Sequence, residues 1–120
     1  MARRLARWNN PRVSHKSIVV LEPDASWSSE VEQEAGPESH IVVLGRRPGE
    51  SASAFERRAR ERLESLASKR PTRGVLVHGA GGRMGGASRS ALRRVLTEVV
   101  HGAGGHEVVA LGVMRPKRVA

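Results

Sequence analysis

A glycine-rich segment is the stretch of this chain best suited to binding a ligand. Residues 79–86 contain five glycines in eight positions, after an apolar run and before a helical pattern. Glycine lets backbone N–H groups approach a phosphate closely, and the amino end of the following helix adds partial positive charge. We therefore predict a phosphate or nucleotide site, to which arginine side chains would supply further contacts. Its predicted residues are Arg46, Arg47, His78, Gly79, Gly81, Gly82, Arg83 and Gly85.

The same segment has a simpler interpretation, as a mobile connection that binds nothing. His78 is the best single candidate for chemistry because it ends an apolar run beside the glycines. Its alternative role is that of a hydrogen-bonded structural histidine. The five histidines are scattered along the chain and cysteine is absent, so the sequence predicts neither a metal site nor a thiol nucleophile. We predict no catalytic residue, and a nucleotide is the one cofactor class that the segment suggests.

Four short apolar runs predict the strands that must position this segment. They lie at residues 18–21, 41–44, 75–77 and 108–111. The runs are continuous rather than alternating, which is typical of strands buried on both faces of a parallel sheet. Ligands of such sheets bind outside the carboxyl ends of the strands, and the glycine-rich segment follows the third run.

Helical patterns occupy the spaces between these runs. The apolar stripe of the first helix is Phe55, Ala59, Leu63 and Leu66, and that of the second is Ala91, Leu92, Val95, Leu96 and Val99. Ser53 with Glu56 fits a capping box for the first helix, and Ser51 is also interpreted as a helix cap. Ser88 is the candidate cap of the second helix. Residues 29–32 predict the start of a further helix of two turns between the first two strands.

The alternation of strands and helices predicts an α/β fold. We expect a single small Rossmann-like or flavodoxin-like domain, with a four-stranded, mainly parallel sheet flanked by helices. We expect the domain to span residues 17–113, between a flexible basic arm at 1–16 and a basic tail at 114–120.

Positive charge dominates the composition of the 120-residue chain. Lys and Arg number 21 against 12 Asp and Glu, which gives a formal net charge of +9. Bases without acids occupy residues 1–16, whereas acids without bases occupy residues 22–38. The two basic ends suggest non-specific contacts with nucleic acid. No apolar run reaches the roughly 20 residues of a membrane span, so we expect a soluble, cytoplasmic protein with no membrane partner.

Two stretches of the chain resemble known families. Residues 55–113 are similar in layout to universal stress proteins, although residues 112–115 lack the glycine motif of the members that bind ATP. This resemblance implies a small regulatory domain. Residues 77–85 resemble the nucleotide loop of dihydrodipicolinate reductase, in which a Gly-Ala-x-Gly-Arg-Met-Gly turn cradles the pyrophosphate of NADPH. That resemblance implies a truncated dinucleotide-binding enzyme.

These observations lead to three functional hypotheses. The first is a non-enzymatic or regulatory α/β domain that binds a phosphate or nucleotide through its glycine-rich segment. The second is a basic module that binds nucleic acid or a protein partner through its arginine-rich ends, and the third is the truncated dinucleotide enzyme. A homodimer formed through an edge of the sheet is compatible with each of them.

Overall fold

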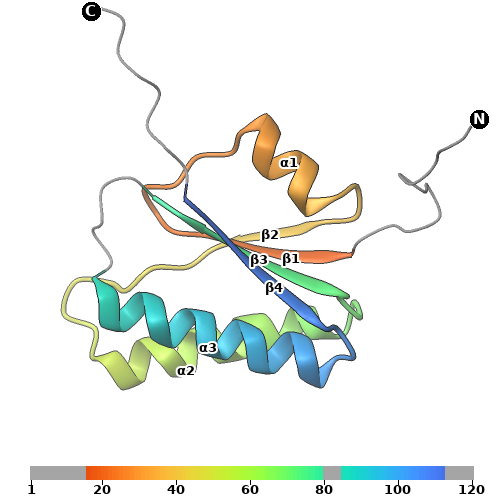
Figure 1. Ribbon diagram of the computed structural model, residues 1–120. Helices are drawn as coiled ribbons and strands as arrows, with labels where there is room; N and C mark the ends of the chain where they lie inside the picture. Colours follow the sequence, from red (N-terminus) through yellow and green to blue (C-terminus); the bar gives the residue numbers. More distant parts are fainter. Residues whose placement is uncertain (1–15, 80–84, 113–120) are drawn as a thin grey trace, which may run out of the picture.

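The computed structural model describes residues 16–79 and 85–112 and shows one four-stranded sheet in which every strand is parallel to its neighbours (Figure 1). The strand order is β2-β1-β3-β4. The strands are β1 (Ser17–Leu21), β2 (His40–Val43), β3 (Arg73–His78) and β4 (Glu107–Gly112). The predicted α/β class and the parallel sheet are confirmed.

Three helices form the layers on either side of the sheet. They are α1 (Ser29–Ala35), α2 (Ala52–Ala67) and α3 (Gly86–Gly102). Helix α1 lies alone on one face, and α2 and α3 lie side by side on the other (Figure 1). Two apolar cores result, because successive residues of each strand point to opposite faces. Ile18 and Val20 of β1 enter the larger core under α2 and α3, whereas Val19 enters the smaller core under α1.

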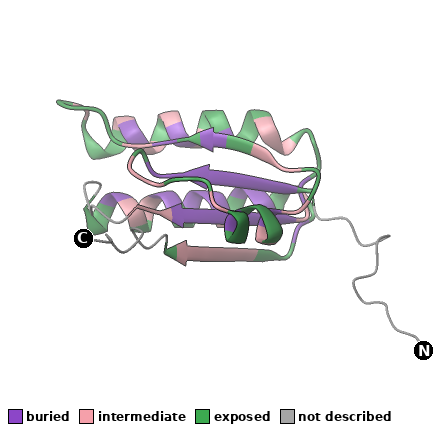
Figure 2. Ribbon diagram, turned by 90° about the horizontal axis from the view of Figure 1, so that it is seen from above, coloured by how far each residue is buried: buried purple, intermediate pink, exposed green. Residues whose placement is uncertain are grey.

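Burial explains why the central strands consist of continuous apolar residues. Every residue of β1 is buried, and so are the first five residues of β3, whereas the edge strands are more exposed (Figure 2). On the edge strand β2, Ile41 and Val43 remain 48 % and 58 % exposed. These two side chains lie on the face of the sheet that carries α1, because their register partners Val19 and Leu21 belong to the core under that helix. The short helix α1 contacts β1 and β3 and leaves them exposed on β2.

The helix caps agree in part with those predicted. Ser51 caps α2 by accepting a hydrogen bond from the backbone N–H of Ala54, whereas Ser53 lies inside the helix. Ser88 is buried inside α3 and does not cap it, since the residue at the N-cap position is Gly85. The cap prediction at Ser51 is therefore confirmed, whereas the capping box at Ser53 and the cap at Ser88 were wrong. The helix α2 begins at the first of two closely spaced serines, and α3 begins at a glycine before its first serine.

The connections between the strands create a switch point in the middle of the sheet. The chain passes from β1 to the edge strand β2 by way of α1 on one face. It then returns past β1 to β3 by way of α2 on the opposite face. The carboxyl ends of β1 and β3, which are neighbours in parallel register, therefore lie where the two crossovers diverge. In open α/β sheets ligands bind at this position.

No helix within the described ranges has the length and apolar character needed to span a bilayer. The predicted arm and tail, apart from Lys16, lie outside the described residues.

Candidate functional site

The switch point brings together four residues from two strands and a helix. Glu22 directly follows β1, His78 ends β3, and Gly79 comes next in the chain. Arg89 lies one turn into α3. Each residue directly follows or belongs to an element with an extensive buried face, so the packed core fixes their relative positions.

Glu22 is the centre of this group and is completely buried. Its Oε1 accepts hydrogen bonds from the backbone N–H of Gly79 at 2.9 Å and from Nη2 of Arg89 at 2.7 Å. Its Oε2 accepts from Nε of Arg89 and contacts Nδ1 of His78 at 3.1 Å. Every oxygen of the carboxylate thus has two partners, and Arg89 binds it in the bidentate manner of the strongest ion pairs.

These contacts determine the ionisation of Glu22. Burial by itself raises the pKa of the carboxyl group, whereas the hydrogen bonds from Arg89, Gly79 and His78 and the charge of Arg89 lower it. The hydrogen bonds and charge outweigh burial, so the pKa of Glu22 lies below its ordinary value. Glu22 is consequently a carboxylate at neutral pH and acts only as an acceptor.

An ionised Glu22 also assigns the tautomer of His78. Because the carboxylate only accepts hydrogen bonds, Nδ1 of His78 must carry the proton in this contact. In the neutral ring the lone pair then resides on Nε2. The side chain of His78 is 21 % exposed, so the ring reaches the surface at the carboxyl edge of the sheet.

Gly79 allows two loops to pass in close contact. A Cβ atom at this position would lie 1.9 Å from Oδ1 of Asp24 and 2.7 Å from the backbone carbon of the same residue. No side chain fits there without displacing the loop after β1. The N–H of Gly79, which we expected to face a ligand, donates to Glu22 in the structure.

The amino end of α3 lies on the far side of the glycine-rich segment. Gly85 has a φ of 80°, a conformation that favours glycine, and it supplies no side-chain hydrogen bond to the helix. The first turn of α3 contains no acidic residue. Its backbone N–H groups therefore lack the side-chain acceptor that serine provides at the starts of α1 and α2. Gly81, Gly82 and Arg83 lie outside the described residues.

Arg46 and Arg47 follow β2 at the same edge of the sheet and are exposed. Glu50 stiffens their loop, accepting the backbone N–H of Arg47 at 2.9 Å and pairing with Arg58 at 2.8 Å. Neighbouring strands are about 4.8 Å apart, and β2 is two strands from β3, so roughly 10 Å separates the strand before this loop from β3. The two arginines can thus reach the outer part of an extended ligand.

Sequence reasoning did not identify Glu22 and Arg89 as a pair. A detectable signal existed, since Arg89 is three and seven residues before Leu92 and Leu96 and so falls on the buried stripe of its helix. A cation on such a stripe requires a partner. The partner, 67 residues earlier in the chain, depends on the strand order, which the sequence does not give.

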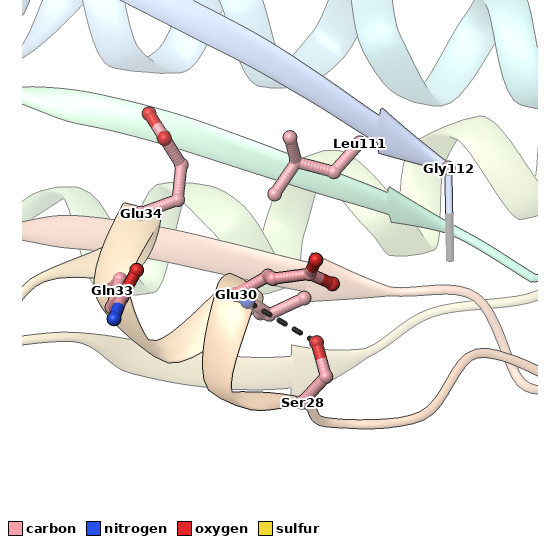
Figure 3. Close-up of a pocket in the computed structure, with 7 residues that line it drawn as sticks. Ser28, Glu30, Gln33, Glu34, Leu111 and Gly112 are labelled. Atoms are coloured by element: carbon pink, nitrogen blue, oxygen red, sulfur yellow. Dashed lines mark hydrogen bonds between the residues drawn. The ribbon is translucent and has the colours of Figure 1, made fainter. Parts of the chain in front are cut away.

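A hollow of about 460 Å³ lies away from this group, between α1 and β4 (Figure 3). Glu30 and Glu34 point from α1 toward it, and Leu111 closes its other side. Of the described residues that line it, two are glutamates and none is basic, so this hollow is unsuited to an anion. No group of three potential metal ligands occurs among the residues that the structure describes.

Comparisons of the chain with protein-family models, with curated proteins and with solved structures gave no match. The fold and the site therefore define the class by themselves. It is a small parallel α/β domain that carries an ion-paired glutamate and a tautomer-fixed histidine at its switch point.

Proposed function

We propose that this protein is a non-enzymatic, regulatory α/β domain that binds a phosphate-bearing ligand, with a nucleotide as the expected class, at its switch point. The observation that carries the proposal is the start of α3. There a glycine-rich connection leads from β3 into a helix whose first turn has neither a side-chain cap nor an acidic residue. Backbone N–H groups and the helix dipole favour an anion at such a position.

The arrangement of charge around the switch point supports the same proposal. Arg89 is paired with Glu22, so these two charges largely cancel, and Asp24 adds a negative charge beside Gly79 and Arg89. The amino end of α3 is then the source of positive potential that an anion would meet among the described residues. Arg46 and Arg47, which follow β2 two strands from β3, suit a second phosphate or the remote part of a nucleotide. The predicted contacts of Gly81, Gly82 and Arg83 belong to the same proposal.

A matched pair of substitutions in α3 tests it. Gly86 and Gly102 are the first and last residues of the helix, and a Cβ at either position would meet no atom within 4 Å. Gly86→Asp places a negative charge at the proposed site, where it also favours the helix. Gly102→Asp places the same charge at the opposite end.

The measurement is the melting temperature of the full chain at low salt, with and without inorganic phosphate, ATP or NADPH. A ligand at ten times its Kd stabilises the folded state by about 1.4 kcal/mol, or a shift of about 5 °C for a domain of this size. We expect the shift in the wild type and in Gly102→Asp and its loss in Gly86→Asp. No shift with any of the three compounds would refute the proposal, and a shift with NADPH alone would favour the dinucleotide enzyme.

A second candidate function, nucleic-acid or protein-partner binding through the basic ends, is favoured by the distribution of charge. The described residues contain 13 Lys and Arg and all 12 Asp and Glu of the chain. The remaining eight basic residues are in segments 1–15, 80–84 and 113–120, which contain no acid. The folded part is thus almost neutral. Deleting residues 1–15 and 113–120 should abolish a salt-dependent mobility shift of DNA or RNA, and an unchanged shift would exclude this function.

Self-association through the edge strand β2 is a separate proposal about partners. Ile41 and Val43 are exposed there, and an edge strand presents unpaired backbone groups. Val43→Lys should then convert a dimer into a monomer in sedimentation equilibrium. A wild-type protein that is monomeric at the highest concentration measured would exclude the homodimer.

A further inference from the structure

The imidazole of His78 has a nucleophilic atom that the proposed binding function does not use. Glu22 holds Nδ1 at 3.1 Å through Oε2, and the same carboxylate is fixed by Arg89 and by the backbone of Gly79. The ring is therefore held in one orientation, with its Nε2 lone pair directed away from Glu22. It lies immediately before the glycine-rich segment in the chain, at the surface of the switch point.

We propose that Nε2 of His78 accepts a phosphoryl group from a small phosphorylated donor held at the switch point. This inference rests on the proposed function, because the anion site formed by the start of α3 would position the donor. A histidine whose opposite nitrogen is hydrogen-bonded to a carboxylate has the geometry of an activated nucleophile, in which a third group orients the reacting one. His78 with Glu22, itself fixed by Arg89, has this geometry.

The step requires no further reactant. The lone pair of Nε2 attacks phosphorus, the bond between phosphorus and the leaving group breaks, and the leaving group departs with the bonding electrons. With phosphoramidate as the donor, the nitrogen that leaves is already protonated and departs as ammonia. The product is an imidazolium that retains the proton on Nδ1 and carries the phosphoryl group on Nε2.

The surroundings of His78 suit this product. Its positively charged ring would face the carboxylate of Glu22 through the Nδ1 proton, at the 3.1 Å contact already present. The phosphoryl group adds close to two negative charges, which the amino end of α3 favours. A solely structural histidine would need the contact with Glu22 but would show no preference for a phosphoryl donor.

The test is a time course of the full-length protein with ammonium phosphoramidate at neutral pH, followed by mass spectrometry without exposure to acid. His101 and His106 are exposed histidines of the same molecule, far along the chain, and serve as internal controls. We expect His78 to be phosphorylated at least about tenfold faster than either control. We expect Glu22→Gln to abolish this preference while circular dichroism shows a folded protein.

Equal rates at the three histidines, or a preference that persists in folded Glu22→Gln, would overturn the proposal. If Glu22→Gln does not fold, ¹⁵N NMR of the wild-type ring decides instead. A neutral His78 protonated on Nδ1 supports the proposal, and one protonated on Nε2 overturns it.

The melting-temperature shift with inorganic phosphate separates this inference from the proposed function. A phosphate-induced shift without preferential phosphorylation of His78 would refute the inference alone. The absence of preferential phosphorylation together with no shift from phosphate, ATP or NADPH would refute both. In His78→Gln, the fast phosphorylation should disappear and leave the slow rates of His101 and His106, while the melting-temperature shift with inorganic phosphate remains.

Discussion

Removing the charge of Arg89 is the perturbation with the largest predicted consequence for the site. Arg89→Met keeps most of the length and apolar surface of the side chain but removes both hydrogen bonds to Glu22. Glu22, which is completely buried, then retains, among the described residues, Gly79 and His78 as hydrogen-bond partners. An ionised carboxylate in that position is far less well compensated than in the wild type.

The expected loss is about 3 kcal/mol. Breaking a buried ion pair by removing one partner typically destabilises a protein by about 3–5 kcal/mol. The lower end applies because the side chain of Arg89 is 31 % exposed, so water can partly replace it. With a urea m-value of about 1–1.5 kcal/mol/M for a domain of this size, the unfolding midpoint should fall by roughly 2–3 M.

Urea titrations of the wild type, Arg89→Met and Arg94→Met at neutral pH test this estimate. Arg94 is the matched control, because it belongs to the same helix and binds both oxygens of Glu56 at 3.0 Å, yet is 51 % exposed. We expect Arg94→Met to shift the midpoint far less than Arg89→Met. Equal shifts in the two variants would refute the view that Glu22 is a buried charge that depends on Arg89.

The pH dependence provides an independent check on the same pair. The lowered pKa of Glu22 stabilises the wild type above the unfolded pKa of about 4.3, and this contribution is lost as the pH falls toward the folded value. In Arg89→Met, the hydrogen bonds and charge of Arg89 no longer offset burial, so the pKa of Glu22 is higher than in the wild type. Protonation of Glu22 at lower pH then removes its unpaired charge. The gap between wild type and variant should therefore narrow from pH 7 to pH 4. A constant gap would contradict the assignment.

Two further predictions concern the close approach at Gly79 and the contacts of Glu50. Gly79→Ala should destabilise the domain by about 2 kcal/mol, because its Cβ would collide with Asp24. Gly86→Ala, whose Cβ would meet no neighbouring atom, should stabilise the domain by up to about 1 kcal/mol. Thermal melts compare the two, and similar effects would contradict the close approach at Gly79. The pKa of Glu50 is lowered from 4.5 to about 2, mainly by its hydrogen bonds with Arg58 and next by the backbone N–H of Arg47. This carboxylate therefore stabilises the fold above pH 4.5 and loses its effect as the pH falls toward 2. Glu50→Gln should flatten the pH dependence of the urea midpoint in that range, and an unchanged slope would exclude the assigned contacts.

The fold was accessible from the sequence because its strongest signals are local. Continuous β-branched runs such as Ile18–Val20 occur where both faces of a strand are covered, and the structure buries all three of these residues completely. The stripe through Phe55, Ala59 and Leu63 likewise matches the buried face of α2. Each of these patterns lies within a few residues, so no knowledge of strand order was needed.

The centre of the site was not accessible in this way, because it depends on contacts between distant segments. Glu22 was visible only as an acid after the first strand, and Arg89 only as one of many arginines. Their pairing requires β1 and β3 to be neighbours and α3 to cover β3, which the local pattern leaves open. His78, by contrast, was identified because it combines a strand end with the start of the glycine-rich segment.

The central claim is that an anion binds where β3 leads into α3. Its most direct test is a titration of the ¹⁵N-labelled full chain with inorganic phosphate, followed through backbone amide chemical shifts. We predict saturable shifts at His78 and at the amides of Gly85 to Arg89, which lie at the switch point. Shifts confined to exposed arginines of α2 such as Arg57 and Arg62, or no saturable shift at all, would contradict the central claim.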